Sequence, residues 1–253
     1  MNPKRFVIIY IMKIFLSPAK KMVAGKPGLR NPMFLDECVD IAKILNQTST
    51  KDLTKLLEIS PALAELNTKR YSDFSRDTLI NDGESALFTY AGDVYHHWQP
   101  DQFNEEEIGF IDEHFLIISA LYGILRPMDK ILPYRLEMKN KLYYQDKIIS
   151  QYWHDRLNTF MSNIKEPIVL LCSNEYQKAL NLKGHDVTHI KFQEVRNGVL
   201  KTIALNAKRA RGQMAAFITK NKIQKVDELK QFNDMGYNFS ESCSTENTFL
   251  FIK

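Results

Sequence analysis

Cysteine is scarce in this sequence, and no two cysteines stand close together. The three cysteines, Cys38, Cys172 and Cys243, are spread over 253 residues. This spacing excludes a Cys-x-x-Cys zinc or redox pair, and an odd, sparse count argues against a secreted protein held together by disulfides. We therefore expect a protein of the reducing cytoplasm.

Glycine and proline are also few, at 10 and 9 residues, which excludes a fibrous or low-complexity chain. No apolar run reaches the roughly 18 residues of a membrane span, so we expect no membrane association. What the chain does have is 44% hydrophobic and 25% charged residues. That composition is ordinary for a globular protein, and a chain of this length buries a large core without disulfides or metals.

The first residues, MNPKRFVIIYIMKIFL, place two basic residues before an apolar run. This arrangement imitates a signal peptide, but Lys13 interrupts the run. We instead expect an N-terminal extension over residues 1–11, followed by a single domain over residues 12–253 that begins with a buried strand at 13–16. Met12 is an alternative start of translation.

Charge is unevenly distributed along the chain, whose formal net charge is +4. Residues 1–30 and residues 201–225 each hold seven Lys and Arg and no acid, whereas residues 73–113 carry eleven Asp and Glu against one arginine. If the two basic segments converge in the fold, they form a surface that attracts a polyanion. If they lie on separate faces, they are ordinary solvated charge, and the sequence leaves both possibilities open.

Local patterns alternate between helix and strand. Helical spacing or capping residues predict helices at 33–46, 51–58 (capped by Thr50), 61–69 (capped by Ser60), from 105 onward (capped by Asn104), 147–162 and 207–221. Strands are expected at 168–172, 187–195, 199–205 and 248–252, with Asn197-Gly198 as a hairpin turn. The alternation predicts a mixed α/β (α+β) domain in which a mixed sheet is surrounded by helices, because the hairpin argues against a purely parallel sheet.

Two short basic segments are candidate anion sites. Ser17-Pro18-Ala19-Lys20-Lys21 follows the first strand, where a hydroxyl and two cations can meet a phosphate. It is not a Walker loop, because the required glycines are absent. The second segment holds Lys208, Arg209 and Arg211 at the start of the expected last long helix, where cations oppose the helix dipole and an anion would relieve them. Alternatively, the first segment is a surface turn fixed by Pro18, and the second is a solvated basic face.

The segment 119–138, SALYGILRPMDKILPYRLEM, has two prolines that disfavour one continuous helix. Arginine suits phosphate and tyrosine can stack on a base, so four of its residues are candidates for nucleic-acid contact: Tyr122, Arg126, Tyr134 and Arg135. Alternatively, Arg126 pairs with Asp129 and Arg135 with Glu137 in an internal network.

Acids stand in the same motifs as the cations, which DNA binding alone does not require. The candidate catalytic carboxylates are Asp93, Asp129, Glu137 and Glu175. Glu175 belongs to Ser173-Asn174-Glu175-Tyr176, which follows a strand and so stands where open α/β sheets place ligands. Asn174 is alternatively a helix cap. The six histidines show no metal-ligand spacing and no G-x-S-x-G elbow is present, so we expect neither metal nor cofactor.

Residues 53–66, LTKLLEISPALAEL, place two short helices around Ile59-Ser60. The pattern resembles the helix-hairpin-helix of sequence-independent DNA binding, whose hairpin presents backbone N–H groups to a phosphate. The usual hairpin glycines are replaced by Glu58 and Ser60. Ordinary pairing of amphipathic helices explains the leucines equally well.

Taken together, the motifs resemble the YaaA family of bacterial peroxide-stress resistance proteins, in the family's order and from about residue 12 to the end. The matching pieces are FLSPAK (15–20), YAGDVY (90–95), the whole of 119–138, SNEY (173–176), AKRARG (207–212) and GYNF (236–239). The resemblance implies one compact mixed α/β domain with a basic cleft, a helix-hairpin-helix element, and a cytoplasmic protein that binds duplex or irregular DNA. By position it places Lys20, Arg126, Arg135, Lys208 and Arg211 in that cleft, and it carries over no catalytic residues.

Three functions follow as hypotheses. The first is a monomeric DNA-binding protein that limits iron-dependent oxidative damage, in which five phosphate contacts would give a log–log salt slope of about −4 to −5. Its predicted contacts are Ser17, Lys20, Lys21, Tyr122, Arg126, Tyr134, Arg135, Lys208, Arg209 and Arg211. The second is a lyase- or glycosylase-like enzyme acting on nucleobases or nucleotides through the carboxylates. The third, direct iron sequestration, is the poorest because no ligand cluster stands out.

Overall fold

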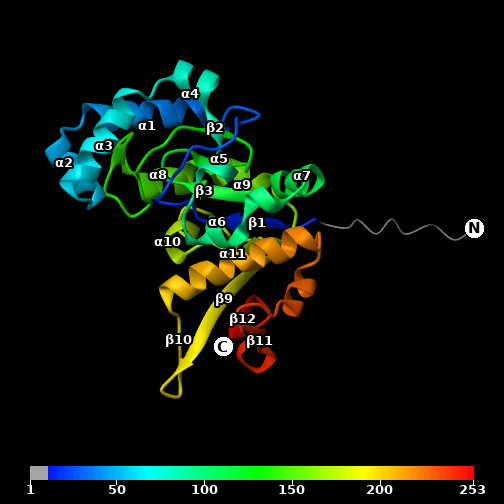
Figure 1. Cartoon of the computed structure of the whole chain (residues 1–253). Coiled ribbons are helices and arrows are strands. Elements are labelled where there is room, and N and C mark those ends of the chain that lie inside the picture. Colours follow the sequence, from blue (N-terminus) through cyan, green and yellow to red (C-terminus); the bar gives the residue numbers. More distant parts are fainter. Residues whose placement is uncertain (1–10) are drawn as a thin grey trace, which may run out of the picture.

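A mixed sheet of eight strands forms the centre of the structure, a computed structural model that describes residues 11–253 (Figure 1). Its strands are β1 (Lys13–Leu16), β3 (Phe115–Ser119), β4 (Gly123–Leu125), β8 (Ile168–Leu170), β9 (Val187–Arg196), β10 (Val199–Lys201), β11 (Asn238–Phe239) and β12 (Thr248–Ile252). The main path runs β11-β12-β9-β8-β1-β3-β4, and β10 pairs with β9. The predicted mixed α/β domain is confirmed, whereas the predicted extension lies outside the described residues except for Ile11.

Helices surround the sheet and carry most of the remaining chain. They are α1 (Leu35–Gln47), α2 (Thr50–Leu57), α3 (Pro61–Ser72), α4 (Arg76–Asp82), α5 (Ala86–Thr89), α6 (Asp93–Trp98), α7 (Glu105–His114), α8 (Ile149–Arg156), α9 (Asn158–Asn163), α10 (Asn174–Gln177) and α11 (Ala204–Lys220). Short strands β2 (Glu84–Ser85), β5 (Lys130–Ile131), β6 (Tyr143–Tyr144) and β7 (Lys147–Ile148) form two small ribbons. Three 3₁₀ turns complete the structure: η1 (Pro100–Gln102), η2 (Val226–Gln231) and η3 (Glu241–Cys243). No helix within residues 11–253 is both long and apolar enough to cross a bilayer.

The three central strands are parallel and buried on both faces. β1 pairs with β3 on one side and with β8 on the other. Ile14, Phe15 and Leu16 have no exposed surface, and the same holds for all three residues of β8. Parallel strands covered on both sides read as continuous apolar runs rather than as alternating ones. This is why apolar runs predicted strands at β1 and β8, whereas β3 was not predicted.

The order of the strands creates a reversal point beside β1. From β1 the chain moves to β3 and β4 on one side, and it later returns to β8, β9 and β12 on the other. The direction of winding therefore reverses between β1 and β8. In open α/β sheets the carboxyl ends of the two strands at such a point leave a crevice in which ligands bind. Ser17 immediately follows β1 there, and Ser173 follows β8 by three residues.

Local signals set several helix starts. Ser60 accepts a hydrogen bond from the Leu63 amide with proline at the first position of α3, and Asn104 forms a capping box with Glu107 at the start of α7, both as predicted. The prediction that Thr50 caps the second helix was wrong by one residue, because Ser49 makes the capping contact. The helix predicted over 147–162 begins at Ile149, because residues 147–148 pair in a ribbon instead, and it is divided into α8 and α9 at Leu157.

The last long helix begins earlier than predicted, at Ala204 instead of residue 207. Lys208 and Arg211 therefore lie beyond its first turn, where the helix dipole has little effect. The dipole argument for an anion at these cations was wrong for this reason. The helix packs so closely on α6 that a Cβ atom on Gly212 would lie 2.2 Å from the carbonyl oxygen of Val94. This contact holds the basic part of α11 beside the sheet edge.

The predicted hairpin at Asn197-Gly198 is confirmed. Both residues have positive φ, 53° and 74°, as a tight two-residue turn requires. The β9–β10 hairpin extends away from the body of the protein (Figure 1). Its base lies next to the start of α11, so the hairpin and the helix border the same region of the surface.

Candidate anion-binding site at the sheet edge

The loops that follow β1 and β8 meet at the reversal point. The Ser173 amide donates a hydrogen bond to the Ser17 hydroxyl at 2.9 Å. The Tyr95 hydroxyl donates to the Ser17 carbonyl at 3.1 Å. Gly92 approaches closely as well, since a Cβ atom there would lie 2.9 Å from the Cβ of Ala19. Three segments that are far apart in the sequence, 17–21, 90–95 and 173–176, thus converge.

The end of the segment 119–138 joins this cluster through Glu137. Its carboxylate is 2.5 Å from the ammonium group of Lys20 and 3.2 Å from the guanidinium group of Arg135. The side chain of Glu137 is only 6% exposed, whereas that of Lys20 is 56% exposed. Next along the chain, the amide of Lys139 donates to the Glu175 carboxylate at 3.1 Å. Two cations and two carboxylates therefore stand together beside the two loops.

A groove of about 520 Å³ opens between the loop that follows β8, the β9–β10 hairpin and α11. Its polar lining residues are Ser173, Asn174, Glu175, Lys191, Gln193, Thr202, Lys208 and Arg211. Lys208 is exposed and Arg211 is half-buried, and burial lowers the pKa of Arg211 below its ordinary value. Within residues 11–253 no carboxylate lies within ion-pair distance of either cation. The groove is therefore a place of uncompensated positive charge.

Arg126 and Asp129 belong to a separate internal network. The carboxylate of Asp129 has no exposed surface, and it contacts Arg126 at 2.8 Å and Arg30 at 3.0 Å. Arg30 also contacts Asp112 of α7 at 2.7 Å. The internal pairing that the sequence left open is thus present. Because Asp129 is enclosed by these partners, we leave it and Arg126 out of the candidate site.

The two tyrosines of 119–138 are buried and cannot stack on a base in this structure, which corrects that part of the prediction. Tyr122 is fully buried and Tyr134 is 2% exposed. The Tyr134 hydroxyl lies 2.8 Å from the hydroxyls of both Tyr90 and Ser119, and burial raises the pKa of Tyr134 to about 12. The Tyr122 hydroxyl contacts both backbone groups of Leu132. These tyrosines hold the 130–135 loop against the sheet instead.

The remaining predicted residues lie around the cluster. Lys21 is exposed beside Lys20, Arg209 is half-buried on α11, and Asp93 is half-buried in the first turn of α6. Sequence reasoning missed Lys139, which forms an ion pair with Glu58, and Gln193 and Thr202 of the hairpin. No local pattern marks these residues, because only the packing of distant segments brings Gln193 and Thr202 to the groove and Lys139 to Glu175.

The helix pair α2–α3 is present, but its turn differs from a phosphate-binding hairpin. The amides of Glu58 and Ile59 donate to the carbonyl groups of Lys55 and Thr54. Glu58, with a φ of 54°, also places a carboxylate in the turn. The turn thus uses its N–H groups internally and carries the wrong charge for a phosphate. We therefore build no part of the site on it.

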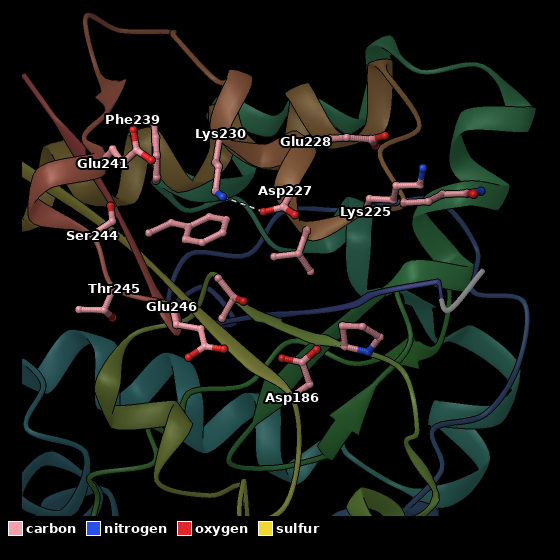
Figure 2. Close-up of a pocket in the computed structure, with 15 residues that line it drawn as sticks. Asp186, Lys225, Asp227, Glu228, Lys230, Phe239, Glu241, Ser244, Thr245 and Glu246 are labelled. Carbon is pink, nitrogen blue, oxygen red and sulfur yellow. Dashed lines mark ion pairs between the residues drawn. The ribbon is translucent and has the colours of Figure 1, made fainter. Parts of the chain in front are cut away.

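A larger cavity, of about 700 Å³, lies at the opposite edge of the sheet, near the residues that precede β8 and β9 (Figure 2). Five carboxylates and two ammonium groups line it: Asp186, Asp227, Glu228, Glu241, Glu246, Lys225 and Lys230. Lys230 pairs with Asp227 at 2.7 Å. Excess negative charge repels a phosphate, so this cavity does not suit an anion. Among the residues that the structure describes, no three His, Cys, Asp or Glu form a group that could hold a metal ion.

The sequence as a whole is similar to proteins of one family. The sequence model described as "Peroxide stress protein YaaA" matches residues 12–243. A UPF0246 protein of Rickettsia bellii is 37% identical over 254 residues, which cover 96% of this chain and 100% of that protein. UPF0246 proteins of Legionella pneumophila and Crocosphaera subtropica are each 35% identical, over 96% of this chain and 99% and 100% of their own lengths.

Proposed function

Because the chain belongs to the peroxide stress protein YaaA family, we propose that it protects bacterial DNA in the cytoplasm during peroxide stress by binding the phosphate backbone and limiting iron-dependent damage. The observation that carries the proposal is the groove at the sheet edge. Lys208 and Arg211 line it without carboxylate partners in the described part of the chain. A surface with unpaired cations releases counterions from DNA when it binds.

The chemistry of the groove favours binding that tolerates any sequence. The exposed cations contact phosphates, which are the same at every base pair. The tyrosines nearest to the site are buried, so they supply no stacking surface for bases. We therefore expect similar affinity for duplexes of different sequence, with strong dependence on salt.

The salt dependence of binding tests this proposal. Arg126 and Arg135 are ion-paired internally, so we expect two to four phosphate contacts and a log–log slope of about −2 to −4, shallower than the sequence implied. Lys208→Gln should reduce the steepness of the slope by about 0.9 and weaken binding. Fluorescence anisotropy with a labelled duplex, measured over a series of salt concentrations, gives both quantities.

Lys220→Gln is the matched control, because Lys220 is an exposed lysine at the other end of the same helix and also lacks an ion pair within residues 11–253. It should leave the slope unchanged. A flat slope for the unaltered protein, or equal losses in both variants, would contradict the proposal.

The second candidate function, an enzyme acting on nucleobases or nucleotides, is favoured by one observation. Glu137 is a nearly buried carboxylate held between Arg135 and Lys20 of the loop that follows β1. Glu137→Gln separates the two functions. If only the cations matter, the variant frees Lys20 and Arg135 from their carboxylate partner. DNA should then bind more tightly, and the log–log salt slope should become steeper by up to about 1.8. If the carboxylate does proton chemistry, turnover should be lost.

Two measurements decide between these outcomes: the anisotropy titration above, and mass spectrometry of bases released from duplexes that carry oxidised or alkylated bases. Glu175→Gln serves as a comparison, because Glu175 accepts a backbone hydrogen bond and forms no ion pair within the described residues. Unchanged DNA across all lesions, together with tighter binding by Glu137→Gln, would reject the enzyme.

A further inference from the structure

Arg211 is a half-buried arginine without an anionic partner in the described chain. Three other partly buried arginines face carboxylates: Arg30 contacts Asp112 and Asp129, Arg126 contacts Asp129, and Arg135 contacts Glu137. Arg70 and Arg209 form no ion pair in the described chain either, but only Arg211 lines the groove. Arg211 has no such contact in the described chain, and its Nε atom is buried without a hydrogen-bond acceptor. A guanidinium group stays charged in proteins, and an uncompensated buried charge is costly. An anionic ligand that binds the Arg211 guanidinium group would explain this arrangement.

The groups around Arg211 are mainly hydrogen-bond donors. Lys208, one helical turn before it, lines the same groove, and so do Ser173 and Asn174, whose side chains make no hydrogen bond to the described residues. Ser17 lies next to them, and its hydroxyl accepts from the Ser173 amide, which leaves its own hydrogen free. The one carboxylate in the lining, that of Glu175, accepts from the Lys139 amide.

This donor set fits a phosphate group. A planar guanidinium fork binds two oxygens of a phosphate, and an ammonium group and hydroxyls can satisfy the others. The position at the reversal point of the sheet is where α/β proteins bind phosphorylated ligands. The groove, at about 520 Å³, is within the size range of small-molecule sites, so it has room for more than the phosphate.

We propose that this groove is a pocket for a single terminal phosphate, anchored by Arg211 and Lys208, and that its ligand is a mononucleotide or the phosphorylated end of a DNA strand. The inference deepens the proposed function and rests on it for the choice of nucleotides. It adds a claim that backbone binding does not make: the pocket binds a phosphate monoester without any duplex.

Thermal unfolding of the full chain tests the pocket, because a ligand that binds only the folded state raises Tm. Deoxyadenosine 5′-monophosphate at ten times its Kd should raise Tm by about 3–5 °C. Deoxyadenosine, which lacks the phosphate, and sodium chloride at equal ionic strength should not. Arg211→Gln should abolish the response and, by removing an uncompensated buried charge, raise Tm in the absence of ligand. Lys220→Gln should keep the response of the unaltered protein.

If Arg211→Gln does not fold, Lys208→Gln and Arg211→Lys replace it in the test. Each should need at least a several-fold higher ligand concentration to give the same rise in Tm. Fluorescence anisotropy with a short single strand of DNA, with and without a 5′-phosphate, shows whether the bound phosphate comes from a DNA end or from a free nucleotide. Tighter binding of the phosphorylated strand points to DNA ends, and equal binding points to free nucleotides; each supports the pocket. No rise in Tm with inorganic phosphate or the monophosphate, or a full response in Arg211→Gln, overturns it.

The two proposals can fail separately. Salt-dependent DNA binding without a response to the monophosphate would overturn the pocket and leave the proposed function standing. A response that depends on Arg211, in a protein that does not bind duplex DNA, would overturn the proposed function and leave the pocket standing.

Discussion

Replacement of Asp129 by alanine is expected to lower the free energy of unfolding by about 3–5 kcal/mol. The carboxylate is fully buried and contacts Arg126 and Arg30, and it also accepts a hydrogen bond from the Arg126 amide at 2.9 Å. Its removal leaves the Arg126 amide without its acceptor and deprives two guanidinium groups, each about one third exposed, of a fully buried partner. The loss is large because the arginines keep their charge after the carboxylate is removed. It does not depend on how much the intact network adds to stability. Urea unfolding, followed by circular dichroism, measures it.

Asp155→Ala is the matched control for this prediction. Asp155 pairs with Lys147 at 2.7 Å, but both side chains are more than 40% exposed. An exposed pair contributes about 0–1 kcal/mol, because water screens it. If Asp129→Ala costs no more than Asp155→Ala, the network around Asp129 does not hold the 126–130 loop in place as the structure indicates.

Gly123→Ala is expected to lower the free energy of unfolding by about 2–5 kcal/mol, the sum of two effects. Gly123 has a φ of +70°, a left-handed conformation that costs residues with a Cβ about 1–2 kcal/mol. An added Cβ would also lie 2.5 Å from the ring of Trp153. That ring cannot move aside easily, because it is fully buried and its Nε1 donates to the Ala120 carbonyl at 2.8 Å.

Gly198→Ala separates the two effects. Gly198 has a similar φ of +74°, but no heavy atom lies within 4 Å of an added Cβ, because the residue is at the tip of the hairpin. We expect a loss of only about 1–2 kcal/mol there. Equal losses at both positions in urea unfolding would show that the contact with Trp153 contributes nothing.

Much of the fold could be predicted from local signals. Strands β1 and β8 follow from continuous apolar runs, the β9–β10 hairpin from Asn197-Gly198, and the starts of α3 and α7 from their capping residues. These features depend on neighbours in the chain, so a single sequence contains them. The late start of the helix predicted at 147 was missed because the turn that pairs residues 147–148 with β6, Gln145-Asp146, has positive φ without a glycine to mark it.

The candidate site was predictable as a set of segments but not as a set of roles. Polar residues after two buried strands pointed to Ser17 and Ser173, which do meet. The same reasoning could not tell that Tyr122 is buried, nor that Arg126 is paired internally while Arg211 is not. Burial and pairing depend on which surfaces the chain brings together, and composition says nothing about that.

The sequence by itself determined the buried strands β1 and β8, the hairpin, the acid-free basic segments and membership of the family, because each is a property of consecutive or periodic residues. Only the tertiary structure decided which cations remain without partners. It enclosed Asp129 between arginines and left Lys208 and Arg211 facing a groove beside β8. The physical reason is that the effect of a charge depends on distance and burial, and both are set by the packing of segments far apart in the chain.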